Sequence, residues 1–336
     1  MSSNQALMDA MTLRQIFIER YSKGEAERLV TYLQRLSLQL QATISSEYER
    51  TRAVRLAQQV ARITQTLLDE YGDDMQEGLR QFAEAEAAFA QQTLAATTAA
   101  EVISPGSLRQ IKAAITTKPM RLITGKTVTE LTIDRAAKQF STKKAREVAQ
   151  IVRDGALVGR TSQEVTREVA DLIEGRTRAQ AASLVRTATN HIGNEARAMT
   201  YAANDDVITG EEFVATLDAH TTLTCAGYDS EIFPVGEGPQ PPLHWACRSV
   251  RTPVINPEYN LGSEITGERA SADGPVSAQT TYSGWLKRQS SDVQDEVLGV
   301  ERAKLFRSGK LSISKFTDDT GRIYTLEELK RLNDLS

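Results

Sequence analysis

The sequence predicts an α+β protein with a mostly helical N-terminal half, a small mixed α/β module and a short C-terminal segment of helix and turns. The first hundred residues contain no proline and only three glycines, so helix can continue almost unbroken there. Alternation of apolar and polar residues begins only after Val207, which indicates short strands. From Tyr282 onward, helical stretches alternate with turns.

Length and composition indicate a globular chain of two or three domains. The 336 residues are 40% hydrophobic and 25% charged, which is typical of globular proteins. Changes in pattern suggest five parts: 1–104, helical; 105–204, helical and leading into the central module; 205–257, strand-rich with a proline-rich loop; 258–280, a linker; and 281–336, the C-terminal segment.

The sequence shows no secretion signal and no membrane-spanning run. Its apolar runs are a few residues long, and its first residues form neither a basic nor an apolar signal region. We therefore expect a protein assembled in the cytoplasm without a membrane partner. Two cysteines cannot form a disulfide framework. The formal net charge of −4 gives no overall reason to bind nucleic acid.

Apolar residues in the first hundred positions recur at helical spacing. They form three stripes: Leu29, Leu33, Leu36, Leu40 and Ile44; Leu56, Val60, Ile63 and Leu67; and Met75, Leu79, Phe82 and Phe89. The stripes suit packing of helix on helix within the chain. The alternative is that these thin stripes bind partner proteins.

Capping signals locate the next helices. Thr161 and Glu164 have the spacing of a capping box, Gly175 predicts a helix end, and another helix is expected over 178–203. Residues 125–127 look like the end of a phosphate-binding loop, but Met120 occupies the place of the required glycine, so we predict an ordinary turn. Short strands are expected at 213–217, 231–233 and 250–255, with a loop over 236–242.

The stretch from Asp218 to Arg248 concentrates scarce residues. It holds both cysteines, two of the three histidines and four of the nine prolines. Such a concentration indicates a specialised module.

With these residues, the chain resembles the Mu F-like, or phage head morphogenesis, minor head proteins of tailed bacteriophages. The matching motifs run from Thr161 to the C-terminus. They are Arg186-Thr187, Thr216-Leu217-Asp218, Thr221, Cys225, Asp229-Ser230, Pro241-Pro242-Leu243-His244, Cys247-Arg248, Tyr282, Trp285, Leu298-Gly299, Phe306 and Phe316.

The resemblance implies a structural protein of the virion, in the head interior or at the portal vertex, that is assembled in the host cytoplasm. Its implied partners are the portal protein and the major capsid protein or scaffold, and its implied role is to assist head assembly. We expect no enzymatic activity and no cofactor. The alternatives are a zinc-binding or catalytic head-maturation protein and an internal protein that contacts packaged DNA.

The cysteines leave three interpretations open. Many members of the family carry further cysteines where this chain has Thr222 and Ser249, so a four-cysteine zinc site is not available. Cys225, His244 and Cys247 could bind zinc if Asp229 or Asp218 completed a tetrahedral site. The favoured interpretation is an ordinary structural turn, in which Asp229 and His244 hydrogen-bond to backbone groups and the cysteines pack as small apolar groups. The third is a Cys225–Cys247 disulfide.

A Cys–His pair near an aspartate also raises the question of nucleophilic catalysis. The sequence has no nucleophile elbow and no oxyanion glycine signature. His191 and His220 are expected at the surface or in helix capping.

Two groups of basic residues are candidates for phosphate contact. They are Arg135, Lys138, Lys143, Lys144, Arg146, Arg153 and Arg160 in one group, and Lys287, Arg288, Arg302, Lys304, Arg307 and Lys310 in the other. The favoured alternative is a solvated face paired with neighbouring acids. Pro239, Pro241 and Pro242 are expected to present a fixed loop surface. Trp285 and Phe306 are expected either to anchor a partner or to form a local core.

Overall fold

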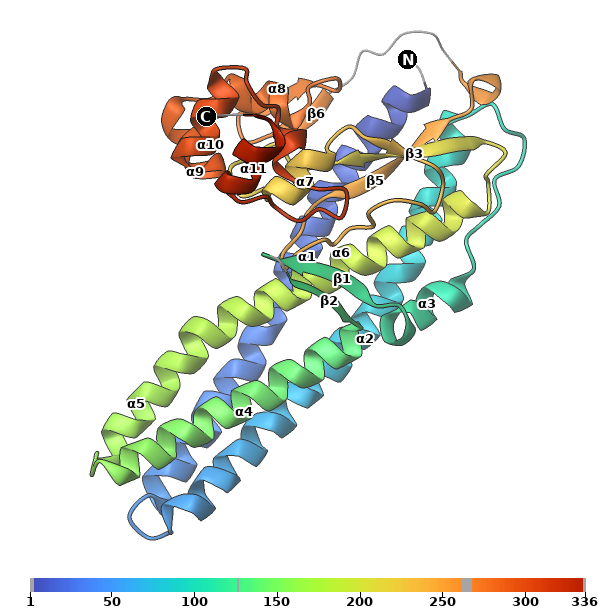
Figure 1. Cartoon of the computed structure of the whole chain (residues 1–336). Coiled ribbons are helices and arrows are strands. Elements are labelled where there is room, and N and C mark those ends of the chain that lie inside the picture. The colour runs from blue at the N-terminus through green and yellow to red at the C-terminus, as the bar shows by residue number, and fades with distance from the viewer. Residues whose placement is uncertain (1–2, 126, 262–267, 335–336) are drawn as a thin grey trace.

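The computed structural model describes residues 3–125, 127–261 and 268–334. Figure 1 shows a long body of helices with a smaller group of strands and short helices at one end. The α+β class predicted from the sequence is confirmed. Of the helices described, none is long and apolar enough to cross a membrane.

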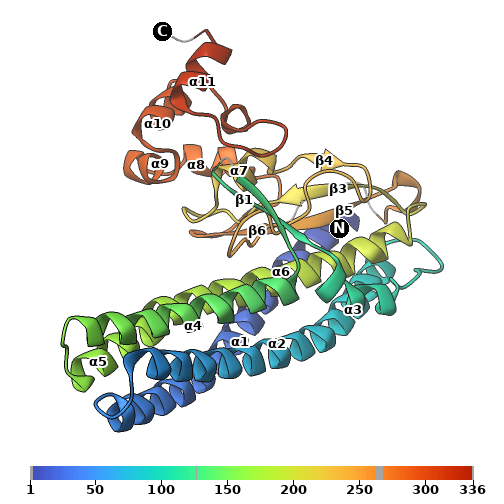
Figure 2. The same ribbon diagram turned by 60° about the horizontal axis from the view of Figure 1, so that its bottom comes forward.

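The body is made of five long helical segments. Two helices of equal length, α1 (Ser3–Glu47) and α2 (Ala53–Thr97), fold back on each other, and α4 (Ile133–Leu157), α5 (Ser162–Leu172) and α6 (Arg178–Ala202) lie alongside them (Figures 1 and 2). The short helix α3 (Leu108–Thr117) precedes a hairpin of β1 (Met120–Thr124) and β2 (Thr127–Leu131). Thr124 pairs with Thr127, so the predicted turn closes this hairpin, although Lys126 lies outside the described residues.

The apolar stripes of α1 and α2 form the core of this body. Leu29, Leu36, Leu40 and Ile44 are fully buried, and they pack in one cluster with residues of α2, α4, α5 and α6. Only Ile63 and Phe89 of the three stripes remain half-exposed. The alternative that these stripes bind partners is therefore wrong, because the chain's own helices cover them.

The capping box at Thr161 is confirmed: its hydroxyl accepts from the backbone of Glu164, and the Glu164 carboxylate accepts from the backbone of Thr161. The helix end predicted at Gly175 is wrong. Residues Ile173–Thr177 form a π-helical turn that joins α5 to α6. Ile173 and Thr177 are buried in the bundle, and this packing offsets the low helix propensity of glycine.

A buried ion triad joins three helices where the body meets the strands. Glu86 of α2 accepts from Arg14 of α1 and Arg197 of α6, both at 2.6 Å. Glu86 and Arg197 are almost fully buried. The loss of Glu86 would leave the buried charge of Arg197 uncompensated, which costs about 3–5 kcal/mol.

A three-stranded antiparallel sheet has the order β4-β3-β5, from β3 (Ile208–Val214), β4 (Ile232–Phe233) and β5 (Val250–Ile255). The strands at 231–233 and 250–255 match their predicted positions. The first strand begins at Ile208 and ends at Val214, earlier than predicted, because the next backbone N–H, that of Ala215, donates to the Asp229 carboxylate instead of a strand. The short helix α7 (Leu223–Tyr228) follows it.

The C-terminal part contains a hairpin and short helices. The hairpin of β6 (Glu268–Ser271) and β7 (Gly274–Ser277) lies within the stretch expected to be a linker, and η2 (Pro257–Tyr259) precedes it. Then follow α8 (Tyr282–Lys287), α9 (Ser291–Leu298), α10 (Val300–Arg307), η3 (Ile313–Phe316) and α11 (Leu326–Leu332).

Candidate functional site

Asp229, directly after α7, joins three elements. Its Oδ1 accepts from the backbone of Ala215 at 2.8 Å, and its Oδ2 accepts from the backbone of Tyr282 at 2.6 Å. Arg269 of β6 forms an ion pair with the same carboxylate, and both side chains are almost fully buried. The aspartate of the sequence motif therefore connects the end of β3, the hairpin and the start of α8.

Asp218 holds the turn that leads into α7. Its carboxylate forms a two-pronged ion pair with Arg248, with one contact of 2.8 Å from Nη2. The hydroxyl of Thr221 donates to the Thr216 carbonyl at 2.6 Å and to Asp218. Burial opposes ionisation of Asp218, but the hydrogen bond and charge of Arg248 outweigh it and lower the Asp218 pKa. This carboxylate is therefore ionised and paired.

Thr187 of α6 fixes the loop that carries His244 and Cys247. Its hydroxyl donates to the Ser183 carbonyl and accepts from the backbone of Ala246 at 2.8 Å. Ala246 has a positive φ of 59°, a conformation that is uncommon for a residue with a side chain. The motif threonine thus supports a constrained turn between His244 and Cys247.

The proline-rich loop is exposed over residues 236–238 and becomes buried at its end. Pro241 and Pro242, joined by a cis peptide bond, are buried. Arg251 donates to the carbonyls of Glu237 and Pro239, each at 3.0 Å. The expected fixed surface of prolines is wrong for Pro241 and Pro242, because both side chains are buried.

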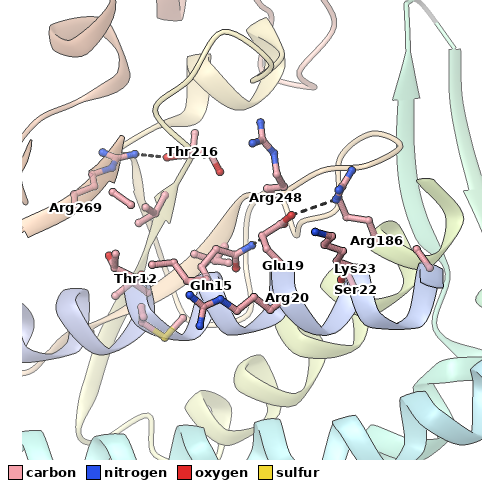
Figure 3. Close-up of a pocket in the computed structure, with 18 of the residues that line it drawn as sticks. Thr12, Gln15, Glu19, Arg20, Ser22, Lys23, Arg186, Thr216, Arg248 and Arg269 are labelled. Carbon is pink, nitrogen blue, oxygen red and sulfur yellow. Dashed lines mark hydrogen bonds and ion pairs between the residues drawn. The ribbon is translucent and has the colours of Figure 1, made fainter. Parts of the chain in front are cut away.

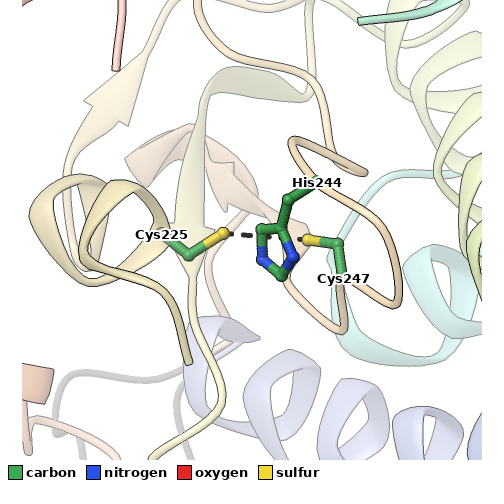
Figure 4. Close-up of side chains that lie close together, drawn as sticks. All are labelled: Cys225, His244 and Cys247. Carbon is green, nitrogen blue, oxygen red and sulfur yellow. Dashed lines mark hydrogen bonds between the residues drawn. The ribbon is translucent and has the colours of Figure 1, made fainter. Parts of the chain in front are cut away.

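The structure brings Cys225, His244 and Cys247 together (Figure 4). The two sulfur atoms lie 3.7 Å apart, and one ring nitrogen of His244 lies within 4.8 Å of both. Cys225 sits in the first turn of α7, where Thr222 caps the helix. Both cysteines are buried in a small cluster with Phe213, Ala215, Tyr228 and Leu243.

Neighbouring groups shift the pKa values of all three side chains in this cluster. Burial raises the pKa of the Cys247 thiol, but hydrogen bonding from Cys225 and the charge of His244 together lower it well below the ordinary value. Burial likewise disfavours the charged His244, yet the negative Cys247 raises the His244 pKa overall. The pKa of Cys225 is raised by its hydrogen bond to Cys247 and by burial. The pKa is thus lowered for Cys247 and raised for Cys225.

Asp229 and Asp218 do not complete this cluster. The described cluster of potential ligands contains only the two cysteines and His244, whereas the two carboxylates are held by Arg269 and Arg248. The expected fourth ligand is therefore wrong. The Thr222 hydroxyl accepts from the backbone N–H of Cys225 at 3.5 Å.

A cavity of about 610 Å³ lies between α1, α6 and the strands (Figure 3). Met8, Met11 and Ile16 form apolar parts of its lining. Arg20, Lys23, Arg178 and Arg186 form a cationic rim, and Arg248 and the buried Arg269, which pair with Asp218 and Asp229, also line the cavity. Arg186, the motif arginine of α6, pairs with Glu19 at 3.3 Å across the rim. The lining includes neither cysteine and not His244.

The two basic groups differ in their surroundings. On α4, Lys144 is buried and pairs with Glu147 at 2.6 Å, whereas Arg135, Lys138, Lys143, Arg146 and Arg153 are exposed. In the C-terminal group, Lys304 pairs with Glu301 and Arg307 with Asp295. The solvated-face interpretation thus fits the C-terminal group better than α4.

Trp285 and Phe306 belong to a local core. Each is 2% exposed, and both pack with Leu298, Phe316 and other apolar residues of the C-terminal part. The Trp285 indole donates to Asp273 at 3.0 Å, and Gly299 takes a positive φ of 76° between α9 and α10. The expectation of a partner anchor is wrong for these two aromatic residues.

Three residues of the site were missed in the sequence. Arg269 lies in the expected linker, so nothing nearby indicated that it pairs with Asp229. Asn190 and Asn194 of α6 bond the outer edge of β5: Asn190 donates to the Ser249 carbonyl, and Asn194 accepts from the backbone of Arg251. Two asparagines one helical turn apart on a small-residue helix were the available signal.

The fold defines a class of protein in which a helical body carries a small sheet held by buried ion pairs. Residues 146–252 match the family described as Phage Mu protein F like protein. The matched segment contains the C-terminal part of α4, all of α5 and α6, the Cys–His–Cys cluster and the Asp218–Arg248 pair. The resemblance to the Mu F-like phage head morphogenesis family is thereby confirmed.

The match ends at Thr252 within β5, so the C-terminal motifs from Tyr282 onward lie outside it. No curated protein and no solved structure matches the chain.

Proposed function

We propose that this protein is a minor head protein that binds the portal vertex or the inner capsid wall and assists head assembly. The Mu F-like match supports a phage head protein. The structural observation that carries the proposal is the cavity between α1, α6 and the strands, because it offers an apolar recess framed by charge.

The charge of the rim indicates the chemistry of the partner. Within the described residues, no ion pair involves Arg20, Lys23 or Arg178, whereas Arg186 is paired with Glu19. Glu27 is the acid that faces this surplus. An apolar segment flanked by carboxylates would therefore complement the cavity, and charge complementarity of this kind favours specific association.

The neighbouring surface of α1 extends the apolar area. Leu13, Ile16 and Phe17 are 69%, 41% and 44% exposed, and their spacing places them close together on one side of the helix. The methionines of the cavity can adapt to an incoming side chain. The cavity and the apolar ridge formed by Leu13, Ile16 and Phe17 together suit a helix or loop of the portal protein.

The test is a pull-down of the full-length chain with the portal and major capsid proteins of its own phage. The double variant Ile16→Asp, Arg20→Glu places a charge on the ridge and reverses one on the rim, and we expect roughly tenfold weaker portal binding. Leu38→Asp is the matched control, because Leu38 is 66% exposed on the same helix away from the cavity.

The proposal is contradicted if the wild-type chain binds neither head protein. If the double variant binds the portal protein as well as the wild type does, the contact lies elsewhere than at the cavity. DNA binding on the same samples tests a second candidate, which the exposed arginines and lysines of α4 favour. An affinity for duplex DNA that falls steeply with salt and weakens in Arg146→Ala, Arg153→Ala would support it.

A further inference from the structure

We propose that Cys225, His244 and Cys247 bind one Zn²⁺ ion, which acts as a structural staple inside the Mu F-like segment. This inference is independent of the partner bound by the cavity. It assigns a metal site to three residues that the sequence analysis interpreted as part of an ordinary structural turn.

The spacing of the three side chains fits a tetrahedral ion. Zinc binds thiolate at about 2.3 Å, which places two sulfur ligands about 3.8 Å apart across a tetrahedral edge. The Cys225 and Cys247 sulfur atoms are 3.7 Å apart. The third donor, a nitrogen of His244, lies within 4.8 Å of both sulfurs, so a single ion can reach all three with small movements. Two thiolates and an imidazole are a ligand set that favours zinc.

The backbone holds these ligands in place without the ion. Cys225 lies in the capped first turn of α7. Cys247 donates its backbone N–H to the His244 carbonyl at 3.2 Å, and Thr187 anchors the turn between them through Ala246. The two sides of the site therefore come from separate elements, each fixed by its own hydrogen bonds.

The surroundings of His244 leave one nitrogen for the metal. Its Nδ1 lies 2.9 Å from the Trp245 carbonyl, and a carbonyl can accept only from a protonated nitrogen. Donation from Nδ1–H makes Nε2 the ligand atom, in the arrangement that commonly orients metal-bound histidines.

Three protein ligands leave the fourth position of the ion to water. Asp229 is occupied by Arg269 and backbone donors, and Asp218 is occupied by Arg248. Both remain structural in this assignment. The ion would keep its tetrahedral geometry with one position open to water, and it would crosslink α7 and the loop before β5 through its three protein ligands.

Binding at this position would stabilise more than one element. The ion connects α7 to the loop before β5, and α7 in turn contacts the C-terminal part: Thr224 donates to the Gly321 carbonyl at 2.8 Å, and Tyr228 donates to the Asp319 carbonyl at 2.9 Å. Metal binding to a preformed site stabilises the folded state. Zinc therefore would raise the unfolding temperature of the whole C-terminal half.

The experiment titrates the reduced full-length chain with Co²⁺ under nitrogen and then with Zn²⁺. We expect tetrahedral cobalt absorption with a thiolate charge-transfer band that saturates at one ion per chain and disappears when Zn²⁺ is added. Cys225→Ser and Cys247→Ser should each lose most of the charge-transfer band, and His244→Asn should weaken binding. His220→Asn is the matched control, since His220 is exposed and outside the cluster.

Circular dichroism shows whether each variant is folded. If a variant is unfolded, the titration of the wild-type chain still tests whether the site binds metal. The proposal is overturned if the reduced wild-type chain binds no stoichiometric metal, or if both serine variants keep the wild-type cobalt spectrum. A Cys225–Cys247 disulfide in the purified chain, with no metal bound after its reduction, would also overturn it.

Discussion

At the scale of single residues, the buried histidine of α6 departs most from expectation. His191 was expected at the surface or in helix capping, yet it is buried, and its Nε2 lies 3.2 Å from the carbonyl of Lys118 at the end of α3. The surface alternative is wrong, and the capping alternative describes its contact. Burial lowers the pKa of His191 to about 4, so the folded protein keeps this ring neutral.

The lowered pKa of His191 predicts a loss of stability in mild acid. Between an unfolded-state pKa of about 6.5 and the folded value, the unfolded chain binds more protons, so stability falls as pH decreases. The contribution of this group amounts to roughly 3 kcal/mol once pH reaches the folded pKa. Urea unfolding of wild type and His191→Gln at several pH values between about 7 and 4.5 measures it.

We expect His191→Gln to be less stable at neutral pH and to lose part of the wild-type slope in acid. His220→Gln should keep that slope, because His220 is exposed. Parallel pH profiles for wild type and His191→Gln would show that another group controls the acid response.

At the scale of elements, the contact of α4 with α5 depends on the absence of one side chain. A Cβ on Gly155 of α4 would overlap the Cγ2 of Val165 on α5 and would lie 3.2 Å from the Tyr48 hydroxyl. The two helices therefore approach closely at the far end of the body. A Cβ on Gly24 of α1, in contrast, would have no neighbouring atom within 4 Å.

Alanine at these two glycines should have opposite effects. Gly155→Ala introduces overlap in a packed interface and should cost about 1–3 kcal/mol. Gly24→Ala removes backbone freedom from the unfolded chain without a clash and should add about 0.5–1 kcal/mol. Urea midpoints of the two variants and the wild type test this contrast. A neutral Gly155→Ala would mean that α5 can shift away from α4 at little cost.

At the scale of the whole molecule, the C-terminal part is fastened to the Mu F-like segment by a shared core and by Asp229. Leu217, Leu223 and Ala226 belong to the same apolar cluster as Trp285 and Phe306. The buried Asp229 carboxylate holds both Arg269 and the backbone of Tyr282. The two parts should therefore unfold together.

Asp229→Ala should weaken that attachment. It leaves Arg269 buried without its partner, which costs about 3–5 kcal/mol. We expect faster protease cleavage between β5 and α8, followed by mass spectrometry of the fragments. Asp319→Ala is the control, because Asp319 is an exposed acid in the same part of the molecule. If cleavage is unchanged in Asp229→Ala, the apolar cluster alone holds the C-terminal part.

The sequence by itself determined the features that depend on neighbours along the chain. The helical stripes of α1 and α2, the capping box of Thr161 and the strand at 250–255 follow from periodicity and local hydrogen bonding, which few nearby residues decide. The Mu F-like motifs were recognised in the same way, because their order along the chain is itself the signal.

Only the tertiary structure decided which residues from distant parts of the chain contact one another. It showed that the stripes face one another, that helix continues through Gly175, that Asp229 pairs with Arg269 forty positions later and that Cys225 meets His244 and Cys247. These outcomes depend on packing between distant segments, whose burial outweighs local propensity. A residue's partner across the fold leaves no trace in its immediate neighbours. For this reason the sequence left Asp229 open as a fourth zinc ligand, whereas the structure shows it in an ion pair with Arg269.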